Sequence, residues 1–378
     1  MKRAIILVIA VSLLSLPISG CLTSQIAGFT EADLNAPIIE FAESVPPSLP
    51  SPLSGDTPTF SYSLEWMMTE VFVHFGGAMN LSVKNTGNRE MFIYGYGLKW
   101  SNSTEVWSRD TEAYVHPDQR VALGLLTFPG PRNAGSIFYS IVLKAAVRTT
   151  SGSDWHDYGN LTAADRVTDV KELAHDQSYT VQKNNKDYYN RVNSRINFTA
   201  VEDVVGEIQA AYPGAYNTLQ IAQAYEWVYS SIKYAEDSDG DYWQSATETL
   251  SLGEGDCEDH AILMASIIGA LGGNARVNVI SEHAFPTVYV GNDSSYLVPL
   301  RTSLNSYYGT EFQICFLQDS LGFWLVVDTT GFPYAGGLPS LSSPTIDSHT
   351  SVTWTFNDSD WLITVDATGE TATDSGIF

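Results

Sequence analysis

The sequence has 378 residues, of which 43 are acidic and 19 are basic, so its formal net charge at pH 7 is −24. A nucleic-acid binder needs a concentrated basic surface, and this excess of carboxylates argues against nucleic acid as a partner. Hydrophobic residues make up 44% of the chain, which is enough for a buried core and argues against a wholly disordered protein. The 3 cysteines are too few to hold a chain of this size together by disulfides.

The first twenty residues have the pattern of a secretory signal. A basic start at Met1–Arg3 precedes an apolar run from Ala4 to Leu16, and small residues follow. The segment that ends in Cys21 resembles a lipoprotein lipobox, which implies cleavage before this cysteine and lipid attachment to it. We therefore expect residues 1–20 to be a signal peptide and the mature protein to be extracytoplasmic, anchored in the cell membrane by its lipid. An uncleaved signal anchor is the alternative.

Residues 21–58 are predicted to be a tether. The stretch is polar, and the prolines between Pro46 and Pro52 favour extended backbone without internal hydrogen bonds. Such a segment would hold the folded domains clear of a membrane or cell wall.

Residues 59–155 are predicted to form a β-sandwich-like domain of the immunoglobulin kind. Short apolar and aromatic runs are separated by turn residues, and the alternation is clearest at Met91–Tyr96. No group of residues there indicates chemistry, so a spacer and a partner-binding module are both open. Residues 156–198 are polar and poorly periodic, and we expect connecting structure there. The expected strands are Val71–Phe75, Met79–Val83, Met91–Leu98, Val121–Leu126 and Ile137–Val147.

Residues 199–345 have a mixed helix and strand pattern, so the fold class is predicted to be α+β. Thr199 and Glu202 have capping-box spacing at the start of one helix, and a second helix is expected at Thr218–Tyr234. A third helix is expected to begin at Cys257, because an apolar run follows from Ile262 to Leu271 and two glycines close it.

Cys257 is the first candidate for chemistry. A helix start provides free N–H groups and the positive end of the helix dipole, which stabilise a thiolate, although three acidic neighbours oppose this effect. A cysteine nucleophile also needs a histidine base that is oriented by a further polar group. The sequence offers His283 at the start of an expected strand and Asp328 at the end of a later one.

Three segments around these residues resemble the transglutaminase-like superfamily, whose catalytic core is papain-like. Gly255–Ala261 is similar to its GDCxDxA-type segment, His283–Phe285 to its HAW-type segment, and Trp324–Thr330 to its W-x-x-x-D-x-T segment. The resemblance implies a catalytic triad with Cys257 as nucleophile, His283 as general base and acid, and Asp328 as the residue that orients the imidazole.

The resemblance implies a thiol enzyme that transfers acyl groups from amide bonds of protein or peptide substrates, without a cofactor. Hydrolysis, as in a cysteine peptidase, is preferred to cross-linking. The alternative is a non-catalytic surface binding or assembly protein that uses the same scaffold. The sequence departs from the family pattern at Phe285, where tryptophan is common. An insertion at 292–322 also separates His283 from Asp328, and it could shape access to the cleft or displace Asp328 from the triad.

Other polar residues of this half have less specific patterns. Gln244 is a candidate oxyanion donor, and the backbone N–H of Cys257 is another. His260 lies three residues after Cys257 and could assist it or share a metal with it, but further metal ligands are not evident. Part of the acidic loop before these residues matches calcium-loop spacing, although tyrosine replaces its glycine. The weak calcium alternative has four carboxylate ligands, Asp237, Asp239, Asp241 and Glu248. The other interpretation of these residues is a solvated acidic loop.

Residues 346–378 are expected to contain C-terminal strands and a tail. The patterns Val352–Phe356 and Trp361–Val365 predict two strands that complete a sheet, and Cys315, in an apolar run, is expected to be a core residue.

Overall fold

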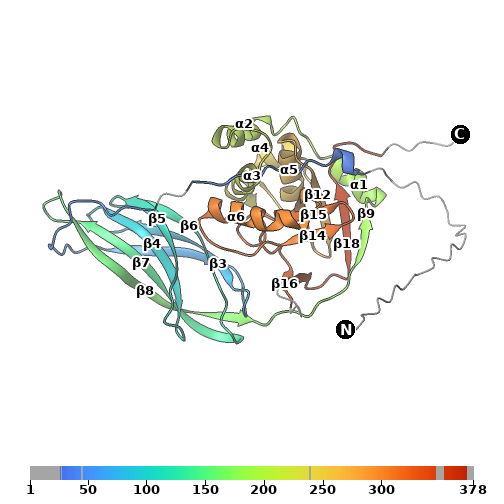
Figure 1. The fold of residues 1–378 in the computed structure, drawn as a ribbon. Helices are drawn as coiled ribbons and strands as arrows, with labels where there is room; N and C mark the ends of the chain where they lie inside the picture. Colours follow the sequence, from blue (N-terminus) through green and yellow to red (C-terminus); the bar gives the residue numbers. More distant parts are fainter. Residues whose placement is uncertain (1–25, 27, 44–45, 238–239, 346–352, 373–378) are drawn as a thin grey trace, which may run out of the picture.

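The computed structural model describes residue 26 and residues 28–43, 46–237, 240–345 and 353–372. The predicted signal segment, Cys21 and Asp239 lie outside these residues. Figure 1 shows an elongated β-rich lobe beside a larger lobe of helices and strands, so the predicted α+β class is confirmed.

The β-rich lobe consists of two packed sheets, as predicted. One sheet has the order β1-β3-β6 and the other β2-β8-β7-β4-β5. The apolar side chains of their inner faces share one core, to which β4 and β7 contribute most. The strands are β1 Tyr62–Met68, β2 Val71–Phe72, β3 Gly77–Asn85, β4 Met91–Trp100, β5 Trp107–Val115, β6 Arg120–Phe128, β7 Gly135–Arg148 and β8 Trp155–Lys171.

The mixed lobe is built on a six-stranded sheet with the order β14-β15-β13-β12-β18-β9. Neighbouring strands are antiparallel except β18 and β9, which are parallel. Its strands are β9 Thr180–Lys183, β12 Ala275–Ile280, β13 His283–Gly291, β14 Phe316–Asp319, β15 Gly322–Val326 and β18 Trp361–Asp366. Two-stranded pairs are formed by β10 Lys233–Tyr234 with β11 Glu254–Gly255, and by β16 Ser342–Pro344 with β17 Trp354–Phe356.

The helix α5 lies at the centre of the mixed lobe, against β12 and β13. Its apolar residues occur on every side, and the run from Glu258 to Ile268 is buried throughout. A helix that is apolar all round needs neighbours all round, and α2, α3 and α4 supply them. The helices are α1 Lys186–Asn193, α2 Glu202–Ala211, α3 Thr218–Ser231, α4 Ala246–Leu252, α5 Cys257–Ala270 and α6 Leu297–Tyr308, with 3-10 turns η1 Glu31–Asp33 and η2 Ser294–Tyr296. None of the described helices combines the length and apolar character of a membrane-spanning segment.

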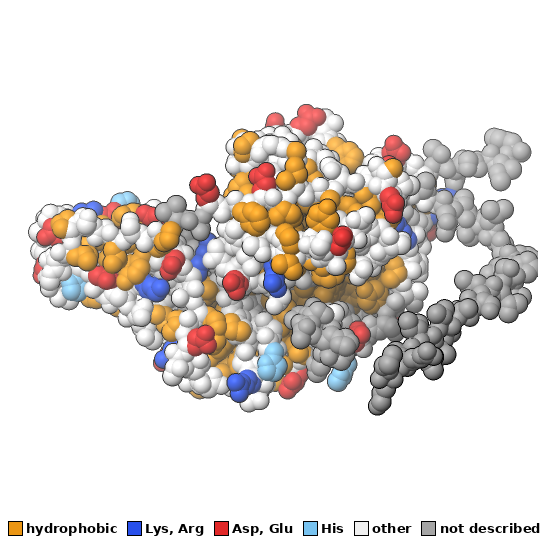
Figure 2. All heavy atoms as spheres, in the orientation of Figure 1, with side chains coloured by type: hydrophobic (Ala, Val, Ile, Leu, Met, Phe, Trp, Pro, Cys, Tyr) orange, Lys and Arg blue, Asp and Glu red, His pale blue; other side chains and the backbone are white. Residues whose placement is uncertain are grey.

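Apolar and polar contacts join the two lobes. The ring of Phe75 meets the ring of Phe332 edge-on at 5.8 Å, and the apolar core of the mixed lobe continues to Phe72. The Thr127 hydroxyl lies 2.8 Å from the Thr310 hydroxyl and donates to the Glu311 carbonyl at 2.6 Å. On the face shown in Figure 2, basic side chains are dispersed among acidic ones.

The segment that was predicted to be a free tether is docked along both lobes, and we call residues 28–43 and 46–58 the N-terminal strap. Figure 1 shows it crossing the mixed lobe toward the sandwich. Its backbone pairs with the loop before α3, because the N–H of Ile38 donates to the Tyr216 carbonyl at 3.0 Å. The N–H of Ala42 donates to Ser306 of α6 at 2.9 Å. The strap reaches the sandwich where the N–H of Ser54 donates to the Trp155 carbonyl at 2.7 Å.

Two further expectations differ from the structure, and one is confirmed. The region 156–198, expected to be connecting structure, contains most of β8, all of β9 and α1. The predicted Thr199 cap is wrong, because α2 begins with Val201 at its N-cap position and no side chain caps it. The expected C-terminal strands are confirmed as β17 and β18, and β18 pairs with β12 inside the main sheet.

Candidate active site

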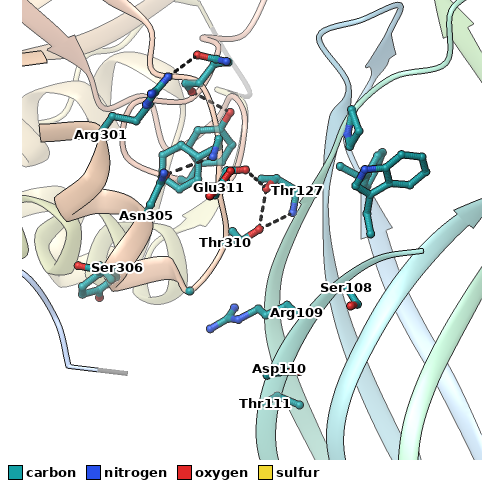
Figure 3. Close-up of a pocket in the computed structure, with 18 of the residues that line it drawn as sticks. Ser108, Arg109, Asp110, Thr111, Thr127, Arg301, Asn305, Ser306, Thr310 and Glu311 are labelled. Atoms are coloured by element: carbon teal, nitrogen blue, oxygen red, sulfur yellow. Dashed lines mark hydrogen bonds between the residues drawn. The ribbon is translucent and has the colours of Figure 1, made fainter. Parts of the chain in front are cut away.

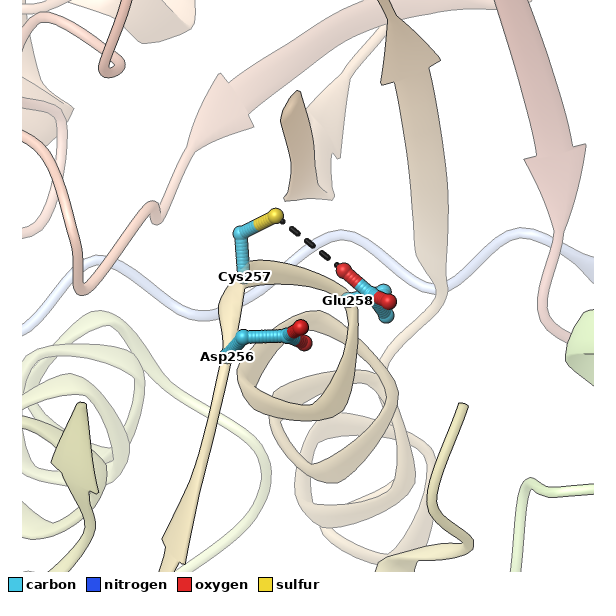
Figure 4. A group of neighbouring side chains, drawn as sticks. All are labelled: Asp256, Cys257 and Glu258. Carbon is cyan, nitrogen blue, oxygen red and sulfur yellow. Dashed lines mark hydrogen bonds between the residues drawn. The ribbon is translucent and has the colours of Figure 1, made fainter. Parts of the chain in front are cut away.

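Cys257 is the first residue of α5, as predicted, and its side chain is half-buried. Its Sγ accepts a hydrogen bond from the backbone N–H of Ala284 at 3.4 Å. The thiol itself donates to Oε2 of Glu258 at 3.2 Å, as Figure 4 shows. The sulfur therefore lies between the start of β13 and the side chain of the following helical residue.

His283 and Asp328 form a buried pair. Nε2 of His283 lies 2.8 Å from Oδ2 of Asp328, and both side chains are almost fully excluded from solvent. The Asp328 carboxylate also accepts from the N–H and hydroxyl of Thr330, at 3.0 and 2.8 Å, and from the N–H of Ser340 at 2.9 Å. Burial alone would raise the pKa of Asp328, but His283 and these donors together lower it below its ordinary value.

The sheet explains how distant residues of the chain meet here. Ile280 and His283 are register partners of β12 and β13, so a two-residue turn fixes His283 at the first position of β13. Strand β15 pairs with β13, with Val326 opposite Thr287, and this pairing brings Asp328 to the imidazole. The insertion at 292–322 forms η2, α6 and β14 and does not displace Asp328.

Phe285, where the family commonly has tryptophan, is fully buried behind the histidine. Its ring stacks on that of His283, with centroids 6.0 Å apart and planes inclined by 17°. It also meets Trp354 and Phe356 of β17 at 6.3 and 6.0 Å. The C-terminal segment thus helps to hold the imidazole in place.

The thiol environment contains several carboxyl groups at short range. Burial and the Glu258 carboxylate raise the pKa of Cys257 above its ordinary value. Burial and the neighbouring Glu258 raise the pKa of Asp256 to about 8, and burial raises that of Glu258 as well. In the free protein these groups favour the neutral thiol and oppose the effect of the helix start.

Asp259 organises the start of α5, a role that the sequence analysis missed. Its Oδ1 accepts from the N–H of Gln244 at 2.7 Å and its Oδ2 from the N–H of Asp256 at 3.2 Å. A Cβ at position 255 would lie 2.7 Å from the Cβ of Asp259, so the glycine allows this close approach. The Gly-x-Cys-x-Asp spacing places the glycine beside Asp259, but it does not indicate the bond to Gln244.

Gln244, the predicted oxyanion candidate, is buried and held beside the start of α5 by its backbone bond to Asp259. Its side-chain Oε1 has no hydrogen-bond partner among the described residues. Among the described residues, no hydrogen bond joins this side chain to Cys257.

His260 is buried on the same helix and binds elsewhere. Its Nδ1 lies 2.8 Å from the Thr329 hydroxyl, next to Asp328 in the chain. Burial lowers the pKa of His260 to about 4, so this imidazole is neutral at pH 7. Cys315 is buried as predicted, and burial raises the pKa of its thiol.

The carboxylates of the calcium alternative have separate partners. Glu248 accepts from the N–H and hydroxyl of Ser245 at 2.7 and 2.9 Å, which caps α4. Asp241 pairs with Arg191 at 2.9 Å, and Asp237 accepts from the N–H of Tyr242 at 2.6 Å. These contacts account for Glu248 as a capping residue of α4, and the weak calcium alternative stays a prediction.

Among the described residues, one group has three metal-type ligand atoms within 4.8 Å of one another, namely Asp256, Cys257 and Glu258. Figure 4 shows that they come from consecutive positions at the start of α5. The bond from Cys257 to Glu258 already uses two of these atoms, so we assign no metal to them.

A large cavity lies elsewhere in the described part of the chain. It has a volume of about 1580 Å³ and opens between β5 and β6 of the sandwich and α6 of the mixed lobe (Figure 3). Cys257, His283 and Asp328 are not among its lining residues. It is lined on both sides by charged and polar side chains, which include Arg109, Asp110, Thr127, Arg301, Asn305 and Glu311.

One comparison with known proteins identifies part of the mixed lobe. Residues 203–298 match the model of the transglutaminase-like superfamily, and this range contains Cys257 and His283 and stops before Asp328. No curated protein sequence is a significant match to the chain.

Two solved structures show only remote likeness. The first is native alpha-2-macroglobulin from Escherichia coli, from domain MG7 to the C-terminus, at 12% identity over 56% of this chain and with a TM-score of 0.20. The present chain covers 33% of the length of that one. The second is PapD-like domain 7 of human CEP192, at 10% identity over 34% of this chain and 98% of that domain, with a TM-score of 0.17. With scores this low, neither likeness defines the fold, and the family match stands on its own: residues 203–298 carry a transglutaminase-like core.

Proposed function

We propose that the protein is a thiol acyl-transfer enzyme that acts on amide bonds of proteins or peptides through Cys257, His283 and Asp328. The observation that carries the proposal is the buried pair of His283 and Asp328, joined at 2.8 Å, whose neighbour Ala284 contacts the Cys257 sulfur. A nucleophile, a base and a group that orients the base are the parts that such catalysis needs.

The geometry supports a definite division of roles. Because Nε2 of His283 is engaged by Asp328, Nδ1 is the ring nitrogen available to the thiol. The thiol proton moves to Nδ1, the thiolate attacks the amide carbonyl, and the leaving amine takes the proton from the imidazolium. Water then cleaves the thioester and releases the acid and the free thiol. We prefer water to an amine as the acceptor, so the proposed reaction is hydrolysis.

The test compares three variants with the unmodified protein on a panel of unfolded polypeptides, and it measures both cleavage and amine incorporation. The Cys257→Ala and His283→Ala variants should lose activity, and Cys315→Ser should keep it. A thiol-directed probe should label Cys257 faster than the buried Cys315 in the folded protein. Equal labelling of the two cysteines, or full activity of Cys257→Ala, would contradict the proposal.

A second function, a non-catalytic surface binding protein, is favoured by one observation. The Cys257 thiol has a raised pKa and donates to a carboxylate, which is the opposite of what a reactive thiolate needs. A binding protein would keep its partners and its cellular phenotype when Cys257 is replaced by alanine.

We also propose that the protein is an extracytoplasmic lipoprotein anchored through Cys21. The support is the signal pattern and the lipobox-like segment of the sequence. Labelling with a radioactive fatty acid should be lost in Cys21→Ser, and the mass of the purified protein should show whether residues 1–20 have been removed.

A further inference from the structure

The side chain of Glu258 is buried directly against the proposed nucleophile. Only 6% of Glu258 is exposed, and its Oε2 accepts the thiol proton of Cys257 in a hydrogen bond of 3.2 Å. Neither the proposed catalytic steps nor the packing of α5 requires a carboxylate at this position. An apolar residue would suit a helix whose following residues are buried and largely apolar.

The hydrogen bond favours one protonation state of the sulfur. A neutral thiol can donate to a carboxylate, whereas a thiolate beside a carboxylate is a repulsive pair of like charges with no shared proton. Because both groups are largely removed from water, this repulsion is screened less than it would be on the surface. Proton transfer from Cys257 to His283 therefore has to break the bond to Glu258.

The groups around Cys257 and Glu258 determine how strongly the thiol is kept in its neutral form. The positive charge that can form on His283, on β13, favours the thiolate, and the N–H of Ala284 also supports it. The other titratable groups that influence the two side chains are acidic or neutral, apart from Arg191, which pairs with Asp241 before α4. These groups are Asp241, Asp256 and Tyr234, and Asp237 in turn acts on Asp256.

We propose that Glu258 is a positioning residue that keeps Cys257 protonated in the free enzyme and competes with His283 for the thiol proton. The proposal rests on the proposed function and adds a form of regulation to it. The resting enzyme holds a latent thiol, and the thiolate forms when the contact between Sγ and the carboxylate opens. Such a restraint limits unwanted reactions of a nucleophile that faces an oxidising environment outside the cytoplasm.

The test is the pH profile of alkylation of the full chain by iodoacetamide, with the peptides that contain Cys257 and Cys315 quantified separately by mass spectrometry. In Glu258→Gln the amide has the same shape, carries no charge and can donate to a thiolate. We expect the alkylation rate of Cys257 at pH 7 to rise at least tenfold, which corresponds to a fall of one unit in the pKa of the thiol. Cys315 in the same sample is the internal control and should not change.

A matched variant separates the specific contact from the general acidity of the region. Asp256 has a pKa of about 8 and is mostly neutral at pH 7, so Asp256→Asn should leave the alkylation rate of Cys257 at that pH within about twofold. The unmodified protein provides a measurement that does not depend on the folding of a variant. The absorbance of the thiolate should titrate above pH 8.5, the ordinary value of a cysteine.

The outcomes distinguish this proposal from the proposed function. An unchanged or slower reaction of Cys257 in Glu258→Gln, or a thiol that titrates below pH 8.5 in the unmodified protein, would overturn the role of Glu258 alone. A His283→Ala variant that cleaves substrate as fast as the unmodified protein would overturn the proposed function, whatever the profile of Glu258→Gln.

Discussion

Asp328 makes more hydrogen bonds than any other member of the proposed triad. It accepts from His283, from two groups of Thr330 and from Ser340, and it is buried. A carboxylate with so many donors is held in its charged form, and the same donors fix its position relative to the imidazole. Its replacement should therefore affect both the reaction and the fold.

The first prediction concerns Asp328→Asn. Catalytic activity should fall about a hundredfold or more, because the amide cannot stabilise the imidazolium. The free energy of unfolding at pH 7 should fall by about 3 kcal/mol, because one partner of a buried pair is lost. The pKa of Asp328 is lowered in the folded protein, so its contribution is present above the unfolded pKa of about 4 and is lost as the pH falls below it.

Urea unfolding of the two proteins at pH 7 and pH 3 measures this difference. The gap between them should narrow at pH 3, because Asp328 is then protonated in the unfolded chain, whereas its lowered pKa opposes protonation in the folded protein. A gap of the same size at both values would mean that the loss is one of packing and not of charge.

The proposed triad residues could be predicted from the sequence, whereas their close neighbours could not. Cys257 and His283 stand at the starts of elements, where turn glycines and strand patterns mark the positions. The roles of Glu258 and Asp259 depend on the direction in which each carboxylate side chain points at the start of α5. A side-chain direction of this kind follows from packing against β13 and the loop before α4, and no local pattern records it.

At the scale of elements, the start of α3 is capped by a buried side chain. Oδ1 of Asn217 accepts from the N–H of Leu219 at 3.1 Å and from that of Gln220 at 3.0 Å. The side chain of Gln220 returns the contact by accepting from the N–H of Asn217 at 3.3 Å. This capping box fixes the helix against which the strap and α6 pack.

The second prediction is that Asn217→Ala lowers the free energy of unfolding by about 1 to 2 kcal/mol, because two buried N–H groups lose their acceptor. Asn217→Asp keeps the acceptor oxygen and is the control, with a smaller loss. Chemical denaturation at pH 7 compares the three proteins. Equal stability of Asn217→Ala and the unmodified protein would show that water satisfies these groups.

Glu226 of α3 has an unfavourable charge near the contact between the lobes. Burial raises the pKa of Glu226 to about 7, although Tyr308 of α6 and Arg109 of β5 act against the shift. Because the folded pKa exceeds that of the unfolded chain, the stability that this group contributes is full at low pH. It is lost as the pH rises from about 4.5 to about 7.

The third prediction is that Glu226→Gln raises the free energy of unfolding relative to the unmodified protein. This gain should be larger at pH 8 than at pH 5. The relative gain should reach at most about 3 kcal/mol, which corresponds to the shift in pKa. Urea midpoints of both proteins at the two pH values measure it. A difference that does not change with pH would contradict the buried, ionising carboxyl.

The strands also show where sequence patterns fail. β13 and β18 are apolar and were predicted, because strands that are buried consist mostly of apolar residues. All four residues of β9 are exposed, and the strand exists because its backbone pairs with β18. Strand β8 alternates weakly and is held by its long pairing with β7. The residues of such a strand give no sign that it pairs with a strand far away in the sequence.

At the scale of the whole molecule, the strap connects the lobes as a second link beside the chain from β8 to β9. Its proline-rich composition predicts a solvated, extended segment, and the backbone is extended where it docks. The sequence could not show that its N–H and carbonyl groups find partners on α6 and β8. Those partners are backbone and hydroxyl groups, which have no distinctive pattern of their own.

The fourth prediction is that a chain beginning at Gly55 is less compact and less stable than one beginning at Gly28. The shorter chain lacks the hydrogen bonds of the strap, each worth about 1 kcal/mol, and one of the two links between the lobes. Calorimetry should show a lower melting temperature, and small-angle X-ray scattering a larger radius of gyration. The chain beginning at Gly28 is the control and should match the mature protein. Identical thermograms and radii would mean that the strap only covers the surface.

The docking of the strap also limits how far the protein can stand from a bilayer. Phe29 is already fixed to the mixed lobe. Its N–H donates a hydrogen bond to Oδ2 of Asp366 at 3.0 Å, and its ring stacks on that of Trp324. If Cys21 carries the lipid, the chain from there to Phe29 spans at most about 28 Å when fully extended, at about 3.5 Å per residue. The mixed lobe would then be tied to the membrane surface by no more than this length of chain, and any substrate of the proposed site would have to reach this layer.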